Sequence, residues 1–409
     1  MTAPVNSPST PLSILRNRSF LLFCSARVLS TLAYQMLAVA IGWHIYALTK
    51  SAFILGMVGL MQFLPMILLT LYSGHVADRH DRRIIMGLCQ FLQACGVAIL
   101  AVESFTGWAS EESILVIAFC LGAVRTFQMP AQQALLPLIV TSEEFPRAAA
   151  MAASSMEAAA IVGPALGGFL YVFGPGVVYV VISTVFLFGA LQSAIMKSPK
   201  GSNNREPATL KSLTAGIHFI WAKKVILGAI SLDLFAVLLG GATALLPIYA
   251  AEILKVGPTG LGFLRAAPAM GALVMSVYLA RHPLRAKVGR IMFGAVVVFG
   301  LATLGFAVST WFFVSLAMLV ILGASDIISV VIRSSLVQLK TPNEMRGRVS
   351  AVNMMFIGTS NQLGEFESGV TAAWFGTVPS VIIGGLGTVV VALSWMKLFP
   401  ELRDTDRLE

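Results

Sequence analysis

The sequence has 409 residues, of which 57% are hydrophobic and only 11% are charged. A soluble domain carries about 25% charged residues, so this composition excludes an ordinary soluble protein. The net charge of +9 is not gathered into a basic stripe with interleaved aromatic residues, so we expect no nucleic-acid partner. The chain is therefore predicted to be an all-α membrane protein whose surroundings are the lipid bilayer.

Hydropathy divides the chain into twelve runs that are long enough to cross a bilayer as helices, which takes about 20 apolar residues. The polar N-terminal residues show no small-residue cleavage site, so the first run is expected to remain in the protein. The predicted spans are residues 19–47, 51–73, 84–104, 113–139, 147–173, 176–196, 225–248, 257–280, 289–309, 311–339, 348–374 and 378–398.

One long polar stretch separates the sixth span from the seventh. We predict a six-helix bundle over residues 1–197, a cytoplasmic central loop over 198–224, and a second six-helix bundle over 225–409. The second part of the central loop has the pattern of an amphipathic helix that lies on a surface.

Lysine and arginine set the expected orientation. In the predicted topology they gather in the termini, the central loop and the loops on the same side, whereas the other side holds only Lys50 and Lys255. Basic loops are typical of the cytoplasmic side. Both termini are therefore expected in the cytoplasm, and the protein in the cell membrane, which is the inner membrane in a two-membrane bacterium.

The two halves of the chain repeat one another. At an offset of 203 residues IYA at 45–47 recurs at 248–250 and Pro65 recurs as Pro268, and at an offset of 201 LGA at 121–123 recurs at 322–324. Two parallel repeats are related by an axis along the membrane normal and hold the substrate near the midplane between them. We therefore predict two six-helix repeats with a central substrate site.

A cluster of charges stands out in the loop between the second and third spans. The segment GHVADRHDRR at 74–83 crowds five charged residues between two uncharged runs. It is similar to the loop signature of the major facilitator superfamily, although Asp81 stands where a glycine is usual. The segment AAIVGPALGG at 159–168 is similar to the fifth-helix motif of drug:proton antiporters, with Ala159 in place of the first glycine.

Four further segments resemble the branch of that superfamily that contains the enterobactin exporter. They are RTFQMPAQQALLP, SLDLFAVLLGGATALLP, TPNEMRGRVSAV and SNQLGEFESG. The resemblance covers nearly the whole chain. It implies the twelve-helix major facilitator fold, proton-driven export and a monomeric state.

The resemblance also implies roles for the two motifs. Gly74 and Asp78 are expected to contact the opposite half and to stabilise the outward-facing state. The gate motif also includes the arginines Arg79, Arg82 and Arg83, for which anchoring the topology is the simpler interpretation. The helix-five motif is expected to bend its helix, shape the gate and limit proton leak, with plain helix packing as the alternative; its residues are Gly163, Pro164, Gly167 and Gly168.

Ionisable residues inside the spans are candidates for the cargo site or the proton path. Each costs about 2.5–3.5 kcal/mol to insert and therefore usually faces a cavity. Helices one, four, seven and ten line that cavity in the superfamily. The selected residues are Arg27, Arg125, Glu157, Asp233, Asp326, Arg333 and Glu365.

Arg125 and Asp326 are equivalent at the 201-residue offset. We expect them to face each other across the cavity, with Arg125 binding an anionic or phenolic group and Asp326 accepting a hydrogen bond or a proton. Glu365 and Glu367 lie about 200° apart around a helix, so they cannot both face one cavity. Glu365 and Glu157 remain alternative proton carriers.

Other classes of protein lack support in the sequence. There is no HExxH, GxSxG or GxxxxGK[ST] motif, and the four cysteines show no CxxC spacing. We expect no enzyme activity, no cofactor and no metal site. The prediction is a proton-driven exporter, an antiporter, of a small amphipathic molecule such as a siderophore or drug. A proton-coupled importer of the same fold and a non-transporting membrane sensor are the alternatives, and the cargo is left open.

Overall fold

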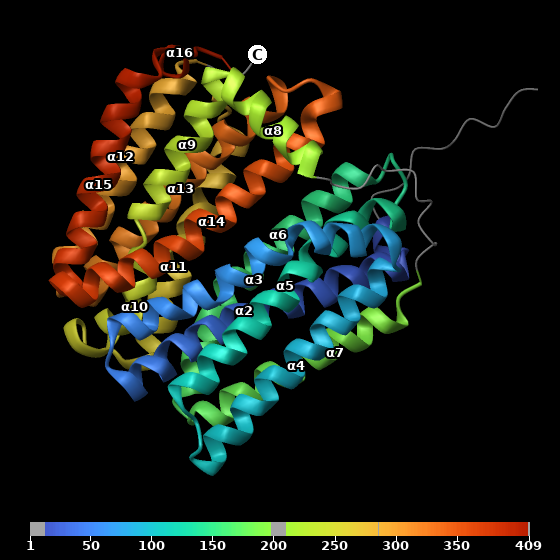
Figure 1. The fold of residues 1–409 in the computed structure, drawn as a ribbon, viewed down its shortest axis with the longest axis vertical. Helices are drawn as coiled ribbons and strands as arrows, with labels where there is room; N and C mark the ends of the chain where they lie inside the picture. The colour runs from blue at the N-terminus through green and yellow to red at the C-terminus, as the bar shows by residue number, and fades with distance from the viewer. Residues whose placement is uncertain (1–12, 198–209, 285, 408–409) are drawn as a thin grey trace, which may run out of the picture.

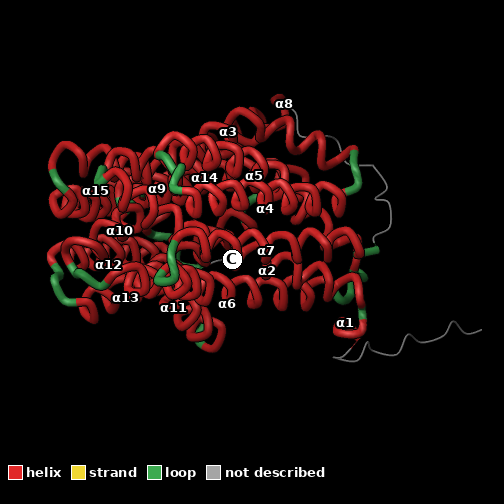
Figure 2. The backbone as a smooth tube through the Cα atoms, turned by 90° about the horizontal axis from the view of Figure 1, so that it is seen from below, coloured by secondary structure: helices red, strands yellow, loops and turns green. Residues whose placement is uncertain are grey.

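The structure is a computed structural model that describes residues 13–197, 210–284 and 286–407. Within this part of the chain every regular element is a helix, and loops are confined to the helix ends (Figure 2). The elements are α1 (Ser13–Arg16), α2 (Arg18–Thr49), α3 (Ala52–Arg79), α4 (Arg82–Thr106), α5 (Glu111–Ile139), α6 (Phe145–Tyr171), α7 (Pro175–Ile195), α8 (Leu210–Ala222), α9 (Lys224–Leu239), η1 (Ala242–Leu245), α10 (Leu246–Ile248), η2 (Tyr249–Ile253), α11 (Gly257–Arg281), α12 (Val288–Val308), α13 (Phe312–Leu339), α14 (Asn343–Phe375), α15 (Thr377–Leu398) and α16 (Pro400–Arg403).

The helices form two bundles, α2 to α7 and α9 to α15, which appear in blue to green and in yellow to red in Figure 1. This is the twelve-helix major facilitator fold that the sequence predicts. Eleven spans in the described residues are long and apolar enough to cross a membrane. The twelfth, α14, has 33 residues but several charges along it, so composition alone does not mark it as a span.

The sequence predicts the seventh span as one helix over 225–248, and the structure shows a broken helix instead. Its first part, α9, ends at Leu239, and the chain continues through Gly240 and Gly241 into the 3-10 helix η1, the short α10 and the π-helix η2. At the break the chain packs closely on α14, because a Cβ atom on Gly241 would lie only 2.6 Å from Ser368 Oγ. Pro247 lies in the first turn of α10, where its missing N–H group leaves no helix hydrogen bond unmade.

The central segment is described from residue 210 onward, so residues 198–209 of the predicted loop lie outside the described part. The expected amphipathic surface helix is present as α8, which packs on α14 and α9. Ile220 is buried there, whereas Trp221 is 69% exposed.

We call the end of the molecule where α2 begins and α15 ends the basic end, after the loops that it carries. At the opposite end the two bundles pack closely. A Cβ atom on Gly168 of α6 would lie 2.3 Å from the Pro258 carbonyl oxygen of α11, and one on Gly56 of α3 would lie 2.8 Å from Gly369 Cα of α14. Toward the basic end the bundles diverge (Figure 1), so the contact between them is tightest at the opposite end.

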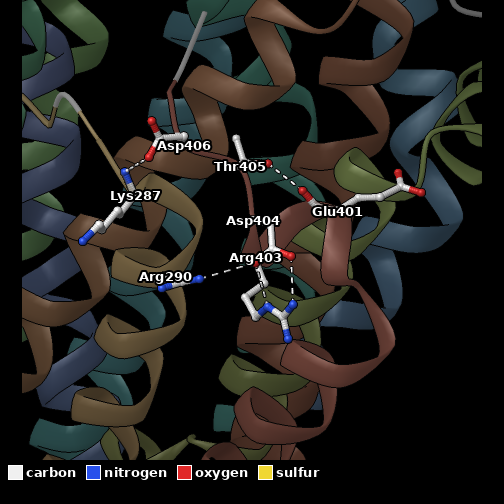
Figure 3. A network of polar contacts seen from close by, with 7 residues as sticks. All are labelled: Lys287, Arg290, Glu401, Arg403, Asp404, Thr405 and Asp406. Atoms are coloured by element: carbon white, nitrogen blue, oxygen red, sulfur yellow. Dashed lines mark hydrogen bonds and ion pairs between the residues drawn. The ribbon is translucent and has the colours of Figure 1, made fainter.

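The C-terminal segment holds the start of α12 at the basic end (Figure 3). The N–H group of Lys287 donates to Asp406 Oδ1 at 3.0 Å, and that of Gly289 donates to the Thr405 carbonyl oxygen at 3.0 Å. These bonds satisfy N–H groups that a helix start leaves free, where anions are also favourable. Hydrogen bonds from Arg403 hold the pKa of the Asp404 carboxyl below its ordinary value.

Candidate functional site

Arg125 of α5 is held at mid-depth by the first bundle. Its guanidinium carbon lies 3.7 Å from the centroid of the Tyr34 ring on α2. The Tyr34 hydroxyl donates to Gln62 Oε1 of α3 at 2.7 Å. A cation over an aromatic ring gains about 0.5–2 kcal/mol, so Tyr34 both stabilises and orients the arginine.

The second bundle contributes an arginine and a carboxylate at the same place. Arg265 Nη2 of α11 lies 3.9 Å from Glu365 Oε1 of α14, and Arg265 Nη1 donates to the Ala38 carbonyl oxygen of α2 at 3.5 Å. Glu365 packs against α3, because a Cβ atom on Gly59 would lie 2.8 Å from Glu365 Cβ. Gln62, the partner of Tyr34, lies three residues after Gly59 on α3, which places Arg125 and Glu365 in the same part of the interface.

These residues define the inter-half cluster, which consists of Tyr34, Gln62, Arg125, Arg265 and Glu365. With both arginines charged and the glutamate ionised, its net charge is positive. Guanidinium groups bind carboxylates and phenolates through paired N–H donors and also stack on aromatic faces. The cluster therefore suits a planar group that carries phenolic or acidic oxygens.

Asp233, Asp326 and Arg333 lie in a different place, inside the second bundle. Asp233 of α9 and Arg333 of α13 are buried and form an ion pair between Oδ2 and Nη1. Next to them is a small cavity with room for about one water molecule. It is lined by Asp233, Ala236, Val237, Val296, Phe299, Ser325, Asp326 and Ser329.

Arg125 and Asp326, which we expect to face each other across one cavity, have different neighbours in the described part of the chain. Arg125 lies on Tyr34 of its own bundle, whereas Asp326 lines the cavity between α9, α12 and α13. The sequence offset gives equivalent positions along two helices. It does not give the rotation of each side chain toward its neighbours, and here the neighbours differ.

Arg27 and Glu157 lie on the α2 and α6 face of the first bundle. Arg27 Nη2 contacts Met156 Sδ at 2.7 Å, and its guanidinium carbon lies 5.3 Å from the centroid of the Phe23 ring. Glu157 is exposed on α6. Glu367 accepts a hydrogen bond from the Thr371 hydroxyl at 2.8 Å, so it and Glu365 have different partners.

The loop signature makes its contacts within the first bundle. Asp78 pairs with Arg82 at 3.8 Å, and Arg82 Nη1 donates to the Ala134 carbonyl oxygen of α5 at 3.2 Å. Arg83 donates to Asp81 and, at 2.8 Å, to the Met196 carbonyl oxygen just after α7. Two of the arginines thus connect the loop to the ends of α5 and α7. Gly74 is partly buried and Arg79 is exposed.

The helix-five motif packs on two different partners. A Cβ atom on Gly163 would lie 2.7 Å from Gln35 Cβ, and one on Gly167 would lie 2.8 Å from Met36 Cα, both on α2. Gly168 instead faces α11 of the other bundle. The carbonyl oxygen of Pro164 also faces α11, 2.6 Å from where a Cβ atom on Gly262 would lie.

The structure adds one contact between the halves that sequence reasoning missed. The Tyr46 hydroxyl of α2 donates to Glu252 Oε1 of η2, and Lys50 Nζ lies 5.2 Å from the Tyr46 ring centroid. In the sequence Tyr46 is visible as part of the IYA repeat and as an aromatic residue near charged positions, and neither feature predicts its contact with Glu252. Tyr34 and Gln62 were missed because they are neutral, and the insertion-cost argument selects only ionisable residues.

Comparison with known proteins gives one family and a set of transporters. The family model described as "Transmembrane secretion effector" matches residues 9–408. The enterobactin exporter EntS of Citrobacter koseri is 25% identical over 384 residues, which cover 92% of this chain and 91% of the relative, and EntS of Escherichia coli O139:H28 is 24% identical over the same shares.

Among solved structures, a bacterial homologue of the human lysosomal transporter Spinster in an inward-facing and occupied conformation has a TM-score of 0.75 at 13% identity. It covers 94% of this chain and 96% of its own. A mutant of the nucleoside transporter NupG has a TM-score of 0.73 at 12% identity and covers 93% of this chain and 100% of its own. These likenesses show the major facilitator fold.

Proposed function

The chain belongs to the transmembrane secretion effector family of the major facilitator superfamily, and from this premise we propose that it is a proton-driven exporter of a small amphipathic molecule with phenolic or acidic groups. As a member of this superfamily it is a multi-pass secondary transporter. The direction, the coupling to protons, the cargo and a monomeric state belong to the proposal.

The inter-half cluster is the observation that carries this proposal. Arg125 comes from the first bundle, while Arg265 and Glu365 come from the second, so rocking of one bundle against the other changes the distance between them. A cargo held by both arginines would be bound in one conformation and released in the other. The Tyr34 ring adds an apolar face for the amphipathic part of the cargo.

The arrangement of the bundles suits loading from the cytoplasm. The basic end carries the excess of lysine and arginine, which is typical of the cytoplasmic side. With that orientation the glycine contacts at the opposite end close the external side, and the bundles diverge toward the cytoplasm. In this state Asp78 pairs with Arg82 of its own bundle, as expected if its contact with the other half belongs to the outward-facing state.

In a proton antiporter, binding of the proton must weaken binding of the cargo, and binding of the cargo must weaken binding of the proton. An ionised Glu365 offers both oxygens as acceptors to the phenolic hydroxyls of a cargo, whereas a protonated Glu365 has a weaker acceptor capacity and becomes a donor on one oxygen. A cargo bound only through negative groups would instead favour protonation of Glu365 and would move together with protons. Export against a proton therefore points to a cargo that donates hydrogen bonds, as catechol groups do.

The names of the relatives supply the first cargo to test. Enterobactin is exported by the EntS relatives, so it serves as the probe for a siderophore-like cargo. In everted membrane vesicles with an acidic interior, the protein should accumulate enterobactin, and a protonophore should abolish the accumulation. Arg125→Ala should abolish it as well, whereas Arg79→Ala, at an exposed loop position, is the matched control for the loss of an arginine.

Accumulation in right-side-out vesicles instead would identify an importer. Binding of the probe without movement in either preparation would identify a sensor. Either result would overturn the proposed exporter.

A further inference from the structure

A cavity inside the second bundle holds two carboxylates and an unsatisfied hydroxyl. Asp233 and Asp326 line it from α9 and α13, and Ser329 lines it from one turn beyond Asp326. Ser329 is only 5% exposed, and its hydroxyl has no hydrogen-bond partner in the described part of the chain. The cavity has room for about one water molecule, so the free hydroxyl faces a space that suits a water-sized ligand.

The first bundle has neutral groups at two of the equivalent positions and an arginine, Arg125, at the position equivalent to Asp326. At the offset of 203 residues Ser30 corresponds to Asp233, and at the offset of 201 Gln128 corresponds to Ser329. Gln128 Nε2 donates to Ser30 Oγ at 2.9 Å, and Gln93 Nε2 of α4 donates to Gln128 Oε1 at 2.9 Å. Neutral groups therefore hold three helices together where the second bundle has Asp233, and Asp326 replaces an arginine of the first bundle with a carboxylate.

The charge balance around the cavity favours binding of one proton. Arg333 compensates Asp233, to which it is paired, and leaves Asp326 without a cation of its own. From α12 the cavity receives Val296 and Phe299, which carry no charge. A buried net charge costs several kcal/mol, and a single shared proton makes the group of two carboxylates and one guanidinium neutral.

The helices around this group bring no further cation. From α15 the Thr388 hydroxyl donates to the Ala236 carbonyl oxygen, and α11 packs on α13 through Pro268 at Gly323. Of the two arginines of α11, Arg265 is directed to Glu365 of the inter-half cluster, and Arg281 is the last residue of the helix. Within the described residues the proton is therefore the simplest neutralising ligand.

The cavity lies next to the inter-half cluster along the chain. Val237 lines the cavity, and its carbonyl oxygen would lie 3.1 Å from a Cβ atom on Gly364 of α14. Glu365 follows Gly364 directly. A shift of α9 on protonation would therefore change the packing of α14 next to Glu365.

We propose that this cavity is a proton-binding site of the transporter, distinct from Glu365 of the inter-half cluster, whose protonation opposes cargo binding. The proposal rests on the proposed proton-driven transport. In it a proton enters as hydronium, is held by Asp326 with Asp233 and Ser329 as hydrogen-bond partners, and leaves a water molecule in the cavity. The ion pair with Arg333 keeps Asp233 ionised and positions it.

Infrared spectroscopy of the purified full-length protein tests this site directly. Aspartate labelled with ¹³C in its carboxyl group shifts the aspartate bands away from those of glutamate. Labelled wild-type protein should show a protonated aspartate band at pH 7 that is lost on alkaline titration. Asp326→Asn should lose this band, and Glu365→Gln, which alters the other carboxylate, should keep it.

Asp326→Glu gives a second measurement that does not depend on whether the Asp326→Asn variant folds. Its band should disappear with labelled aspartate and reappear with labelled glutamate, since the proton site is retained. A band that survives in Asp326→Asn and disappears in Glu365→Gln would overturn this site while leaving proton-driven transport intact.

Two other outcomes also overturn the site. Absence of any protonated carboxyl band between pH 5 and pH 10 would overturn the proposed proton site. If transport in vesicles still required a proton gradient, the protons would then be coupled to transport at another place in the protein. Loss of the band when sodium chloride replaces potassium chloride would show a sodium site instead.

Discussion

Closure of the end opposite the basic end, which we propose is external, depends on the close contact of Gly168 with α11, and a single methyl group should therefore have a large effect. A Cβ atom at this position would lie 2.3 Å from the Pro258 carbonyl oxygen and 3.0 Å from Gly262, where ordinary contacts begin at 3.4 Å. In Gly168→Ala the two helices must therefore separate by about 1 Å. Overpacking of this kind costs about 1–3 kcal/mol, and only in the conformation with this end closed.

A cost confined to one conformation shifts the equilibrium by about 5- to 150-fold. The assay is the reaction of a single cysteine, Met66→Cys on α3, with a membrane-impermeant thiol reagent added outside intact cells that produce the protein without its native cysteines. Gly168→Ala should raise the reaction rate strongly. Gly294→Ala is the matched control, because a Cβ atom there meets nothing within 4 Å. Equal rates in the two variants would refute the role of Gly168 in closure.

Three further predictions test other parts of the account. Tyr46→Phe removes the hydrogen bond to Glu252 and should raise the same thiol reaction rate. Its control is Tyr249→Phe, because the Tyr249 hydroxyl donates to the Ala307 carbonyl oxygen within its own bundle. This control should lower the free energy of unfolding by about 1 kcal/mol and leave the reaction rate unchanged. Asp78→Asn should leave abundance near normal and reduce transport strongly, and normal transport would reduce the loop signature to a topology signal. The pKa of Asp404 is lowered in the folded protein, so the stability that its ionised carboxylate contributes is present above the ordinary aspartate pKa and is lost as the pH falls through the lowered value. Since Asp404 also pairs with Arg290 of α12, Asp404→Ala should accelerate amide exchange at the start of α12 at neutral pH. Unchanged exchange would contradict this prediction.

The sequence predicts most of the fold because membrane spans are recognised by their apolar composition. Long apolar runs give the spans, and the offsets of 203 and 201 residues give the two repeats. The seventh span is the exception, since hydropathy gives no sign of the break after Leu239, where Gly241 packs against Ser368. Hydropathy also gives no sign that α8 rests on α14.

The site was predictable only in part, for a physical reason. Insertion cost selects ionisable residues and so identifies Arg125, Asp326 and Glu365, but the rotation of each side chain is set by its neighbours. Arg125 is directed by Tyr34, a neutral residue that no charge argument selects. The repeat offset predicts Asp326 opposite Arg125, whereas in the structure Asp326 lines the same cavity as Asp233.

The central claim is that the protein moves a phenolic or acidic amphiphile out of the cell. Metabolite profiling of cells and medium, with the wild-type protein and with Arg125→Ala produced at equal abundance in a strain that lacks the natural copy, tests it most directly. The account predicts a compound of this class that is enriched in the medium with the wild-type protein and retained inside cells with the variant. A compound that the wild-type protein removes from the medium, or identical profiles for the two proteins, would contradict it.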